Sequence, residues 1–320
     1  MAEIQLLYLL GFRRLIQNVG GRSRITCKRL NECIGLNSHR LCIIANHRLQ
    51  TLSVLDCPQL ISLHLSANNL KLFRYRGHYP MLWIAYAPSL TDVMLDVRNG
   101  PGSFPLSLDN FLELRDAIQN VEILTLCGWF FKVCSPWWLL PAEETPSHSV
   151  PQFNNLKELW LIDNSMNIFK MDAMVSFLKI CPNLERIFIN IDPTCYCFRN
   201  ELYGWRTVGF EDYVKRTTPN ETLVRLKIIK MAGFIDQEEE ISLIDRLLKD
   251  VAGVEPPMII ATSPENGTRR LIKIPQNQPK LQETGDRKQA AIGNQETEYG
   301  YEFVEEESFV LRPKHADFCL

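Results

Sequence analysis

A short phrase that recurs along the chain constrains the fold more than any other feature. Cys57-Pro58-Gln59-Leu60, Ala87-Pro88-Ser89-Leu90 and Cys181-Pro182-Asn183-Leu184 all read small residue, proline, polar residue, leucine. A proline ends the element before it, and the leucine opens a run of alternating apolar residues that is typical of a short strand. The chain therefore contains an internal repeat, and repeats of this kind stack into a solenoid.

The pattern apolar-x-x-apolar-x-apolar recurs in windows that start at Leu49, Leu60, Leu70, Leu90, Val121, Leu156, Leu184 and Leu223. Because 46% of the residues are hydrophobic, three such positions match by chance in roughly one window of ten. Further evidence comes from the ninth position, which is asparagine at Asn68 and Asn164 and cysteine at Cys57. These three windows match the full leucine-rich-repeat template.

The spacing of the windows separates two kinds of repeat. Starts that are 10 or 11 residues apart leave room for a strand and a turn, and an imperfect repeat at Met81 fits between Leu70 and Leu90. The longer intervals contain apolar residues at helical spacing, namely Phe111, Leu114 and Ile118; Met171, Met174 and Leu178; and Ile241, Ile244, Leu248 and Val251. We therefore predict an α/β leucine-rich-repeat solenoid, a right-handed β-α superhelix resembling ribonuclease inhibitor. Short repeats would form its N-terminal half and helix-containing repeats its C-terminal half.

The repeats also suggest the domain boundaries. Residues 1–40 show no clear repeat and are expected to cap the solenoid, whose open end needs a cover. Residues 41–260 form the repeat domain. The segment from 263 to 320 is predicted to be disordered, because no aromatic residue occurs between Ser263 and Glu298 and the composition there is polar.

No catalytic motif was found. The chain lacks a phosphate-binding loop, a His-Glu-x-x-His pair and a Gly-x-Ser-x-Gly elbow. Cys195-x-Cys197 has no second pair at metal-site spacing, which favours structural thiols, and Ser147-His148-Ser149 lies in a proline-rich loop where nothing orients a base. The sequence therefore predicts a protein that is not an enzyme and has no cofactor or metal.

Charge and cysteine usage restrict the partners and the compartment. The net charge is −2, which argues against a nucleic-acid partner. The apolar run from Ile4 to Leu10 is too short to span a membrane. The ten cysteines include no Cys-x-x-Cys, and Cys42, Cys57 and Cys127 lie in apolar runs. Reduced core thiols are the favoured interpretation, and they predict a cytoplasmic or nuclear location.

The repeat phase indicates a binding surface, because residues that alternate with the inward apolar positions face outward on the concave sheet. The predicted partner-binding residues are Arg74, Arg76, Glu158, Trp160, Arg186, Phe188, Arg225 and Lys227. His64, Asp92 and Asp96 share the same alternation. Trp and Arg are enriched where binding energy concentrates. In the competing interpretation, Trp160 and Phe188 pack on neighbouring strands under a covering loop, and the basic side chains are solvated.

The segment from Cys127 to Phe153 has an unusual density of aromatic residues. Trp129, Phe130, Phe131, Trp137 and Trp138 lie within ten residues. Such a group is rarely left in water. A lid folded back on the solenoid is favoured over an exposed docking patch.

In combination, these features resemble the plant F-box and leucine-rich-repeat proteins of the FBD-associated family. The resemblance rests on Asn69–Tyr75, Ala87–Val93 and Phe153–Leu159, and on Leu226-Lys227-Ile228 followed by Gly233-Phe234, the acidic run Gln237–Glu240 and a helix to Lys249. It covers roughly residues 41–260, and its last part, 223–260, corresponds to the FBD region.

The resemblance implies a substrate receptor of an SCF-type E3 ubiquitin ligase, in which an F-box binds a Skp1-like adaptor and the repeats hold the substrate. Met1 to Arg40 contains no Leu-Pro-Asp-like phrase of the kind that opens an F-box. Residues 1–40 are then a cap or a truncated segment that flanks an F-box, and binding of the adaptor is not expected. The alternatives are a sensor that holds a hormone-like small molecule on the concave face and a non-functional remnant of such a receptor.

Overall fold

The computed structural model describes parts of the chain between residues 16 and 305. It describes residues 16–19, 22–28, 40–45, 49–57, 60–100, 107–134, 151–165, 168–192, 223–233, 237–250, 258–263, 267–273 and 301–305. Its strands are β1 (Ile16–Val19), β2 (Arg22–Lys28), β3 (Arg40–Ala45), β4 (Leu49–Leu55), β5 (Ser62–Ala67), β6 (Leu72–Arg76), β7 (Met81–Tyr86), β8 (Asp92–Asp96), β9 (Ile123–Cys127), β10 (Glu158–Asp163), β11 (Arg186–Ile191), β12 (Ile228–Ala232), β13 (Met258–Ser263), β14 (Gly267–Lys273) and β15 (Tyr301–Glu305). Its helices are α1 (Leu108–Ile118), α2 (Gly128–Cys134), α3 (Ile168–Leu178) and α5 (Gln237–Asp250).

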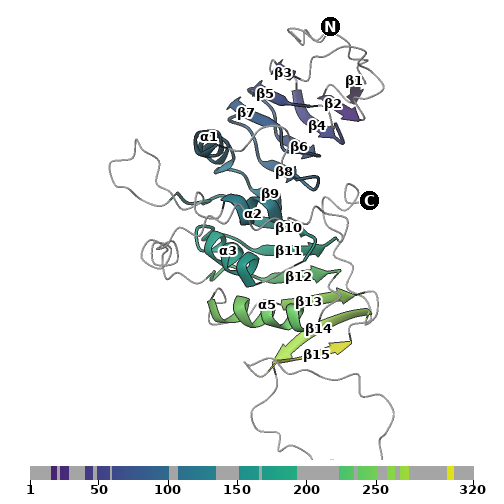
Figure 1. Ribbon diagram of the computed structural model, residues 1–320, viewed down its shortest axis with the longest axis vertical. Helices are drawn as coiled ribbons and strands as arrows, with labels where there is room; N and C mark the ends of the chain where they lie inside the picture. Colours follow the sequence, from purple (N-terminus) through teal and green to yellow (C-terminus); the bar gives the residue numbers. More distant parts are fainter. Residues whose placement is uncertain are drawn as a thin grey trace, which may run out of the picture.

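A large sheet runs the length of the solenoid (Figure 1). Among the described residues its strand order is β1-β2-β4-β6-β8-β9-β10-β11-β12-β13-β14-β15. Neighbouring strands from β2 to β13 are parallel, whereas β1, β14 and β15 join antiparallel at the two ends. This arrangement confirms the predicted leucine-rich-repeat solenoid.

The short repeats alternate between two sheets. Strands β3, β5 and β7 form a separate small sheet, while β4, β6 and β8 belong to the large one. Two parallel neighbours need a crossover connection. In the short repeats this crossover contains a strand of the small sheet: β3 lies between β2 and β4 in the chain, β5 between β4 and β6, and β7 between β6 and β8. The outward assignment of His64 to the concave sheet was therefore wrong, because His64 lies on β5 of the small sheet, where its ring is 4.5 Å from that of Trp83.

The recurring proline phrase forms a turn rather than the start of a strand. The backbone N–H of Leu60 donates to the carbonyl of Cys57, and Leu90 and Leu184 donate likewise to the residues three positions before them. Proline suits the second position of such a turn, because its ring fixes φ there. Each strand then begins two residues after the leucine. The same turn recurs without proline at Phe153–Leu156.

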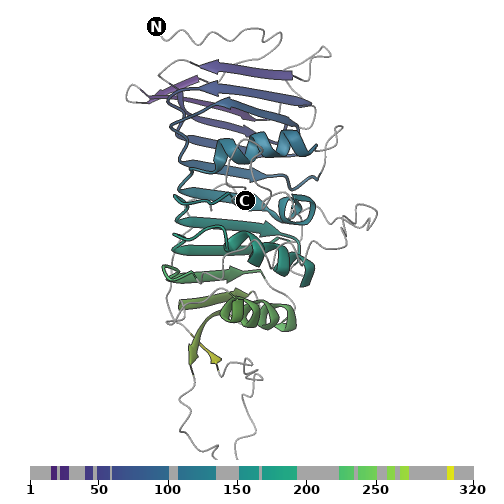
Figure 2. The same ribbon diagram turned by 90° about the vertical axis from the view of Figure 1, so that its left-hand side faces the viewer.

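Helices replace the small sheet in the C-terminal half (Figure 2). The predicted helical patterns are confirmed in α1, α3 and α5. Ser107 caps α1 by accepting a hydrogen bond from the backbone N–H of Asn110. Helix α5 begins directly after Asp236 and buries Leu243 and Ile244. No helix within the described ranges is long and apolar enough to cross a membrane.

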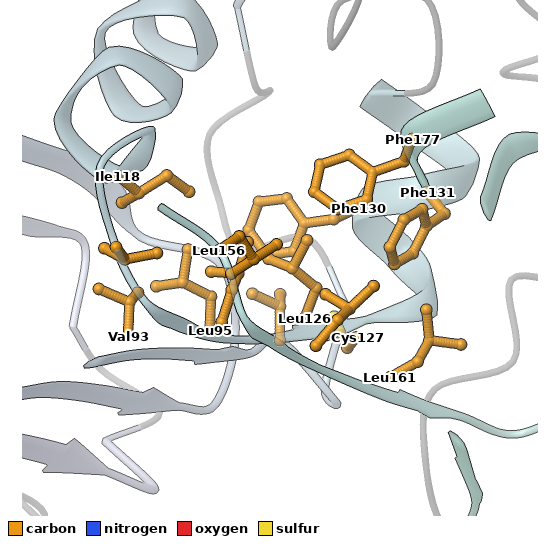
Figure 3. Close-up of a cluster of buried hydrophobic side chains, with 14 of the residues drawn as sticks. Val93, Leu95, Ile118, Leu126, Cys127, Phe130, Phe131, Leu156, Leu161 and Phe177 are labelled. Atoms are coloured by element: carbon orange, nitrogen blue, oxygen red, sulfur yellow. The ribbon is translucent and has the colours of Figure 1, made fainter. Parts of the chain in front are cut away.

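The aromatic segment after Cys127 contributes to the core. Trp129, Phe130 and Phe131 lie in α2, which the sequence did not predict, and all three are buried. The ring centroids of Phe131 and Phe177 are 5.5 Å apart, and Figure 3 shows both rings above strands β9 and β10. These residues do not form an exposed docking patch. Trp137 and Trp138 lie outside the described residues.

The buried thiols agree with the predicted reduced core cysteines. The thiols of Cys57, Cys127 and Cys181 are buried. Burial also raises the pKa of Cys127 and Cys181, so these thiols stay protonated at neutral pH. The placement of Cys195 and Cys197 lies outside the described residues.

The segment after Ser263 contains two strands that the composition did not predict. β14 pairs antiparallel with β13, and β15 pairs antiparallel with β14. The prediction of disorder was therefore wrong for Gly267–Lys273 and Tyr301–Glu305. Strand pairing with the end of the solenoid supplies the stabilisation that the local composition lacks.

Gly233 is required where β12 ends. Its φ is +81°, and a Cβ at this position would lie 2.1 Å from the carbonyl oxygen of Ile191. Gly233→Ala should lower the free energy of unfolding by about 2 kcal/mol, because the backbone is strained and has to shift. Urea unfolding of the variant measures this, with Ala232→Ser as the neighbouring control. Equal stability of Gly233→Ala and wild type would contradict the assigned conformation.

Candidate functional site: the outer face of the large sheet

We define the outer face as the side of the large sheet that faces away from the main core. Leu159 and Leu161 of β10 belong to the main core, whereas Trp160 between them clusters separately with Ile123 and Phe188. Helices and the small sheet lie on the core side (Figures 1 and 2). Because the strands are in register, each outward residue lies beside its counterpart on the next strand, about 4.8 Å away.

The structure brings together four of the predicted site residues. Glu158 pairs with Arg186 and Trp160 with Phe188 across β10 and β11. The rings of Trp160 and Phe188 are stacked with centroids 4.2 Å apart. The Trp160 indole Nε1–H donates to Glu158 Oε1 at 2.7 Å, and Arg186 Nη2 lies 3.1 Å from Glu158 Oε2. These contacts fix the four side chains as one unit.

Most of this unit is inaccessible. Trp160 is 3% exposed and Phe188 is 4% exposed, so neither ring offers a free contact surface. Trp160 and Phe188 pack against each other on neighbouring strands, as in the competing interpretation of the sequence. The side chain of Arg186 is 43% exposed and is the member of the unit that a partner can reach.

Arg74 and Arg76 also lie on the outward side of β6, as predicted. Arg74 is buried. Arg76 forms a double hydrogen bond with Asp56, with Nε to Oδ1 at 3.0 Å and Nη2 to Oδ2 at 2.5 Å. Arg74 and Arg76 therefore make most of their contacts within the solenoid and expose little surface to a partner.

A second ion-pair group lies beyond the ends of the strands. Arg98 Nη2 lies 2.6 Å from Asp96 Oδ2, and Arg98 Nη1 lies 3.5 Å from Asp192 Oδ2. Arg98 follows β8 and Asp192 follows β11, so one guanidinium connects repeats from the two halves of the solenoid. Asp96 is fully buried, which excludes it from the accessible surface.

Burial gives Asp96 a measurable pH dependence. Desolvation raises its pKa above the ordinary 3.8 despite the nearby Arg98. The native state then binds the extra proton more strongly than the unfolded state, so its stability falls as pH rises from about 4 through the raised pKa. Relative to wild type, Asp96→Asn should gain stability between about pH 4 and pH 7. Urea unfolding at several pH values tests this, with Glu113→Gln on α1 as control. If the free energies of unfolding of Asp96→Asn and wild type differ by the same amount at every pH in that range, the raised pKa of Asp96 is contradicted.

Arg225 and Lys227 do not lie on the outer face, and their assignment was wrong. The backbone N–H of Leu226 donates to the carbonyl of Leu223, which is the turn that precedes each strand. The repeat window therefore starts at Leu226, three residues later than predicted. Lys227 Nζ instead lies 3.0 Å from Glu185 Oε2, and this contact lowers the pKa of Glu185.

The shifted register puts other side chains on the outer face. Ile228 lies beside Arg186, Lys230 beside Phe188, and Ala232 beside Asn190. Lys230 and Asn190 are half-buried and within reach of a partner. The sequence contained a signal for this register, since Leu223-x-x-Leu226-Lys227 repeats Phe153-x-x-Leu156-Lys157.

Accessible outward side chains lie over β11, β12 and β13, and we take this part of the outer face as the candidate site. Its outward side chains are apolar, neutral polar or basic, and they lie on a rigid array of parallel strands. In the part of the chain that the structure describes, no group of three His, Cys, Asp or Glu side chains could hold a metal. This arrangement is suited to noncovalent recognition of another molecule.

Comparisons with known proteins agree with the solenoid. The family model described as the At1g61320/AtMIF1 LRR domain matches residues 25–280. The putative FBD-associated F-box protein At1g61330 of Arabidopsis thaliana is 22% identical over 239 residues, which are 70% of this chain and 52% of the relative. The chain thus spans about half the length of this curated relative. No solved structure matches the chain.

Proposed function

The chain belongs to the leucine-rich-repeat family of the At1g61320/AtMIF1 type, and from this we propose that it is the partner-recognition part of an SCF-type E3 ubiquitin ligase. It is a protein-interaction module of the F-box and leucine-rich-repeat type. Such families are generally non-enzymatic. The partner is a protein substrate that binds on the outer face of the large sheet.

One structural observation supports this proposal above the others. The outer face over β11, β12 and β13 combines accessible Arg186, Lys230 and Asn190 with a rigid sheet. Rigid, preorganised surfaces bind with little loss of side-chain and backbone entropy. Similarity to a protein named as FBD-associated and F-box adds the connection to ubiquitin transfer.

Affinity purification from plant tissue with matched variants tests the proposal. Asn190→Glu places a negative charge on the outer face, whereas Asn120→Glu makes the same change at an exposed position just after α1. A substrate should bind wild type and Asn120→Glu, should be lost with Asn190→Glu, and should accumulate in plants that lack the protein. Partners that bind both variants equally, or whose abundance does not change in those plants, would contradict the proposed role.

Binding of the adaptor is a separate question. Because Met1 to Arg40 contains no Leu-Pro-Asp-like phrase, we expect the 320-residue chain to form no complex with a purified Skp1-like adaptor at micromolar concentration. Size-exclusion chromatography of the mixture measures this. Fusing the F-box of a related protein to the N-terminus is the positive control and should restore the complex. Stable binding of the adaptor by the unmodified chain would contradict the expectation.

A further inference from the structure

We propose that the C-terminal part of the outer face recognises an acidic segment of its protein partner. The site consists of Arg186, Lys230 and Arg270 around the apolar pair Ile228 and Met258, and we call it the basic patch. This inference rests on the proposed function, because it specifies what kind of partner the same face binds.

The strand register places the three cations close together. Lys230 of β12 lies beside Ile260 of β13, and Ile260 lies beside Arg270 of β14. Two strand spacings separate the Cα atoms of Lys230 and Arg270 by about 10 Å. Arg186 lies diagonally from Lys230 on the adjacent strand, about 7 to 8 Å away. The cations therefore cover three neighbouring points on one face.

Each cation is able to reach a ligand. Lys230 and Arg270 are half-buried, and the side chain of Arg186 is 43% exposed. Arg186 uses Nη2 to contact Glu158, but a guanidinium has five N–H donors and can bind a second carboxylate. Partial burial lowers the pKa of Lys230, and a carboxylate beside it would favour the charged form again.

No outward position of β11, β12 or β13 in the patch is acidic, although Glu158 of β10 contacts Arg186 and Glu302 of β15 lies diagonally from Arg270 in the strand register. The outward positions of the described strands β11, β12 and β13 are Arg186, Phe188, Asn190, Ile228, Lys230, Ala232, Met258, Ile260 and Thr262. None of them is acidic. The nearest carboxylate after β11, that of Asp192, lies 3.5 Å from Arg98. Charge complementarity therefore selects an acidic ligand over a basic one.

The apolar pair defines the rest of the ligand. Ile228 and Met258 lie beside each other and are both half-buried. Ile228 and Met258 precede Lys230 and Ile260 by two residues on the same strands. The two pairs therefore form two parallel rows across the strands, about 7 Å apart. Because Ile260 is fully buried, a ligand would place carboxylates at Lys230 and Arg270 and an apolar side chain at Ile228 and Met258, and these groups would alternate along it. An extended peptide with alternating Glu and Val residues has this chemistry.

Fluorescence anisotropy with a labelled decapeptide of alternating Glu and Val tests the inference. The Gln-Val peptide should bind about tenfold more weakly, because it lacks the charges. Lys230→Glu combined with Arg270→Glu should weaken binding of the Glu-Val peptide about tenfold and should increase affinity for a Lys-Val peptide. A gain of affinity shows that the double variant is folded.

Lys71→Glu is the matched control, because Lys71 is exposed before β6, far along the solenoid from the patch. It should change affinity for the Glu-Val peptide less than twofold, since exposed charges at that distance are screened. Equal binding of the Glu-Val and Gln-Val peptides would overturn the basic patch. The proposal would also be overturned if Lys71→Glu weakened binding of the Glu-Val peptide as much as the double variant does, or if the double variant did not bind the Lys-Val peptide more tightly than wild type does.

The outcome is independent of the proposed ligase role. If a substrate is lost with Asn190→Glu but the Glu-Val peptide shows no preference over the Gln-Val peptide, the proposed function stands and the acidic specificity is wrong. If the peptide binds as expected but no substrate accumulates in plants without the protein, the patch stands and the ligase role is wrong.

Discussion

Leu159→Asp and Leu63→Asp should each remove most of the stability of the solenoid. Both side chains are fully buried in the main core, Leu159 under the large sheet and Leu63 under the small one. An aspartate there leaves an unpaired charge in an apolar environment and a cavity, which costs more than about 4 kcal/mol. Typical domains have only about 5 to 15 kcal/mol in total. Thermal unfolding followed by circular dichroism measures the loss.

A charge on the exposed side provides the control. Lys157 and Lys71 are exposed immediately before the strands β10 and β6, and replacing either by Asp should change stability by about 0.5 kcal/mol or less. If both leucine variants melt at the wild-type temperature, these positions do not face the core and the repeat phase is wrong.

Trp160→Ala should lower the free energy of unfolding by about 3 kcal/mol, because it removes a buried ring from its stack on Phe188 and leaves a gap. It also leaves Glu158 Oε1 without the 2.7 Å hydrogen bond from the indole. Urea unfolding measures the effect.

Trp160→Phe separates the two contributions. It keeps an aromatic ring against Phe188 but removes the N–H donor, and it should cost about 1 to 2 kcal/mol. If Trp160→Ala is as stable as wild type and yet fails to bind a substrate, Trp160 is an exposed contact residue, as first predicted from the alternation, and not a structural one.

Local patterns were sufficient for most elements of the fold. The apolar spacing at Phe111, Leu114 and Ile118 predicted α1, and the Asp236 signal predicted the start of α5. These features depend on side chains within one or two turns, so the local sequence carries them. The same holds for strand positions that follow a Pro-x-Leu turn, because proline restricts the backbone wherever it occurs.

The last repeat shows where local patterns become ambiguous. Leu223, Leu226 and Ile228 satisfy the repeat pattern, and so do Leu226, Ile229 and Met231. Only the turn hydrogen bond from Leu226 to Leu223 and the pairing of β11 with β12 distinguish the two registers. A shift of register changes which side chains face outward, so Lys230 replaces Lys227 on the outer face.

The sequence by itself determined the repeat, the turns that contain Pro-x-Leu and the helices α1, α3 and α5, because each follows from periodicity or from proline geometry. Tertiary structure decided that the short repeats divide between two sheets, because parallel neighbours cannot be joined by a tight turn. It also decided that Trp160 is buried while Arg186 stays accessible. Alternation tells which side of a strand a residue occupies, but exposure depends on what the neighbouring strands place beside it.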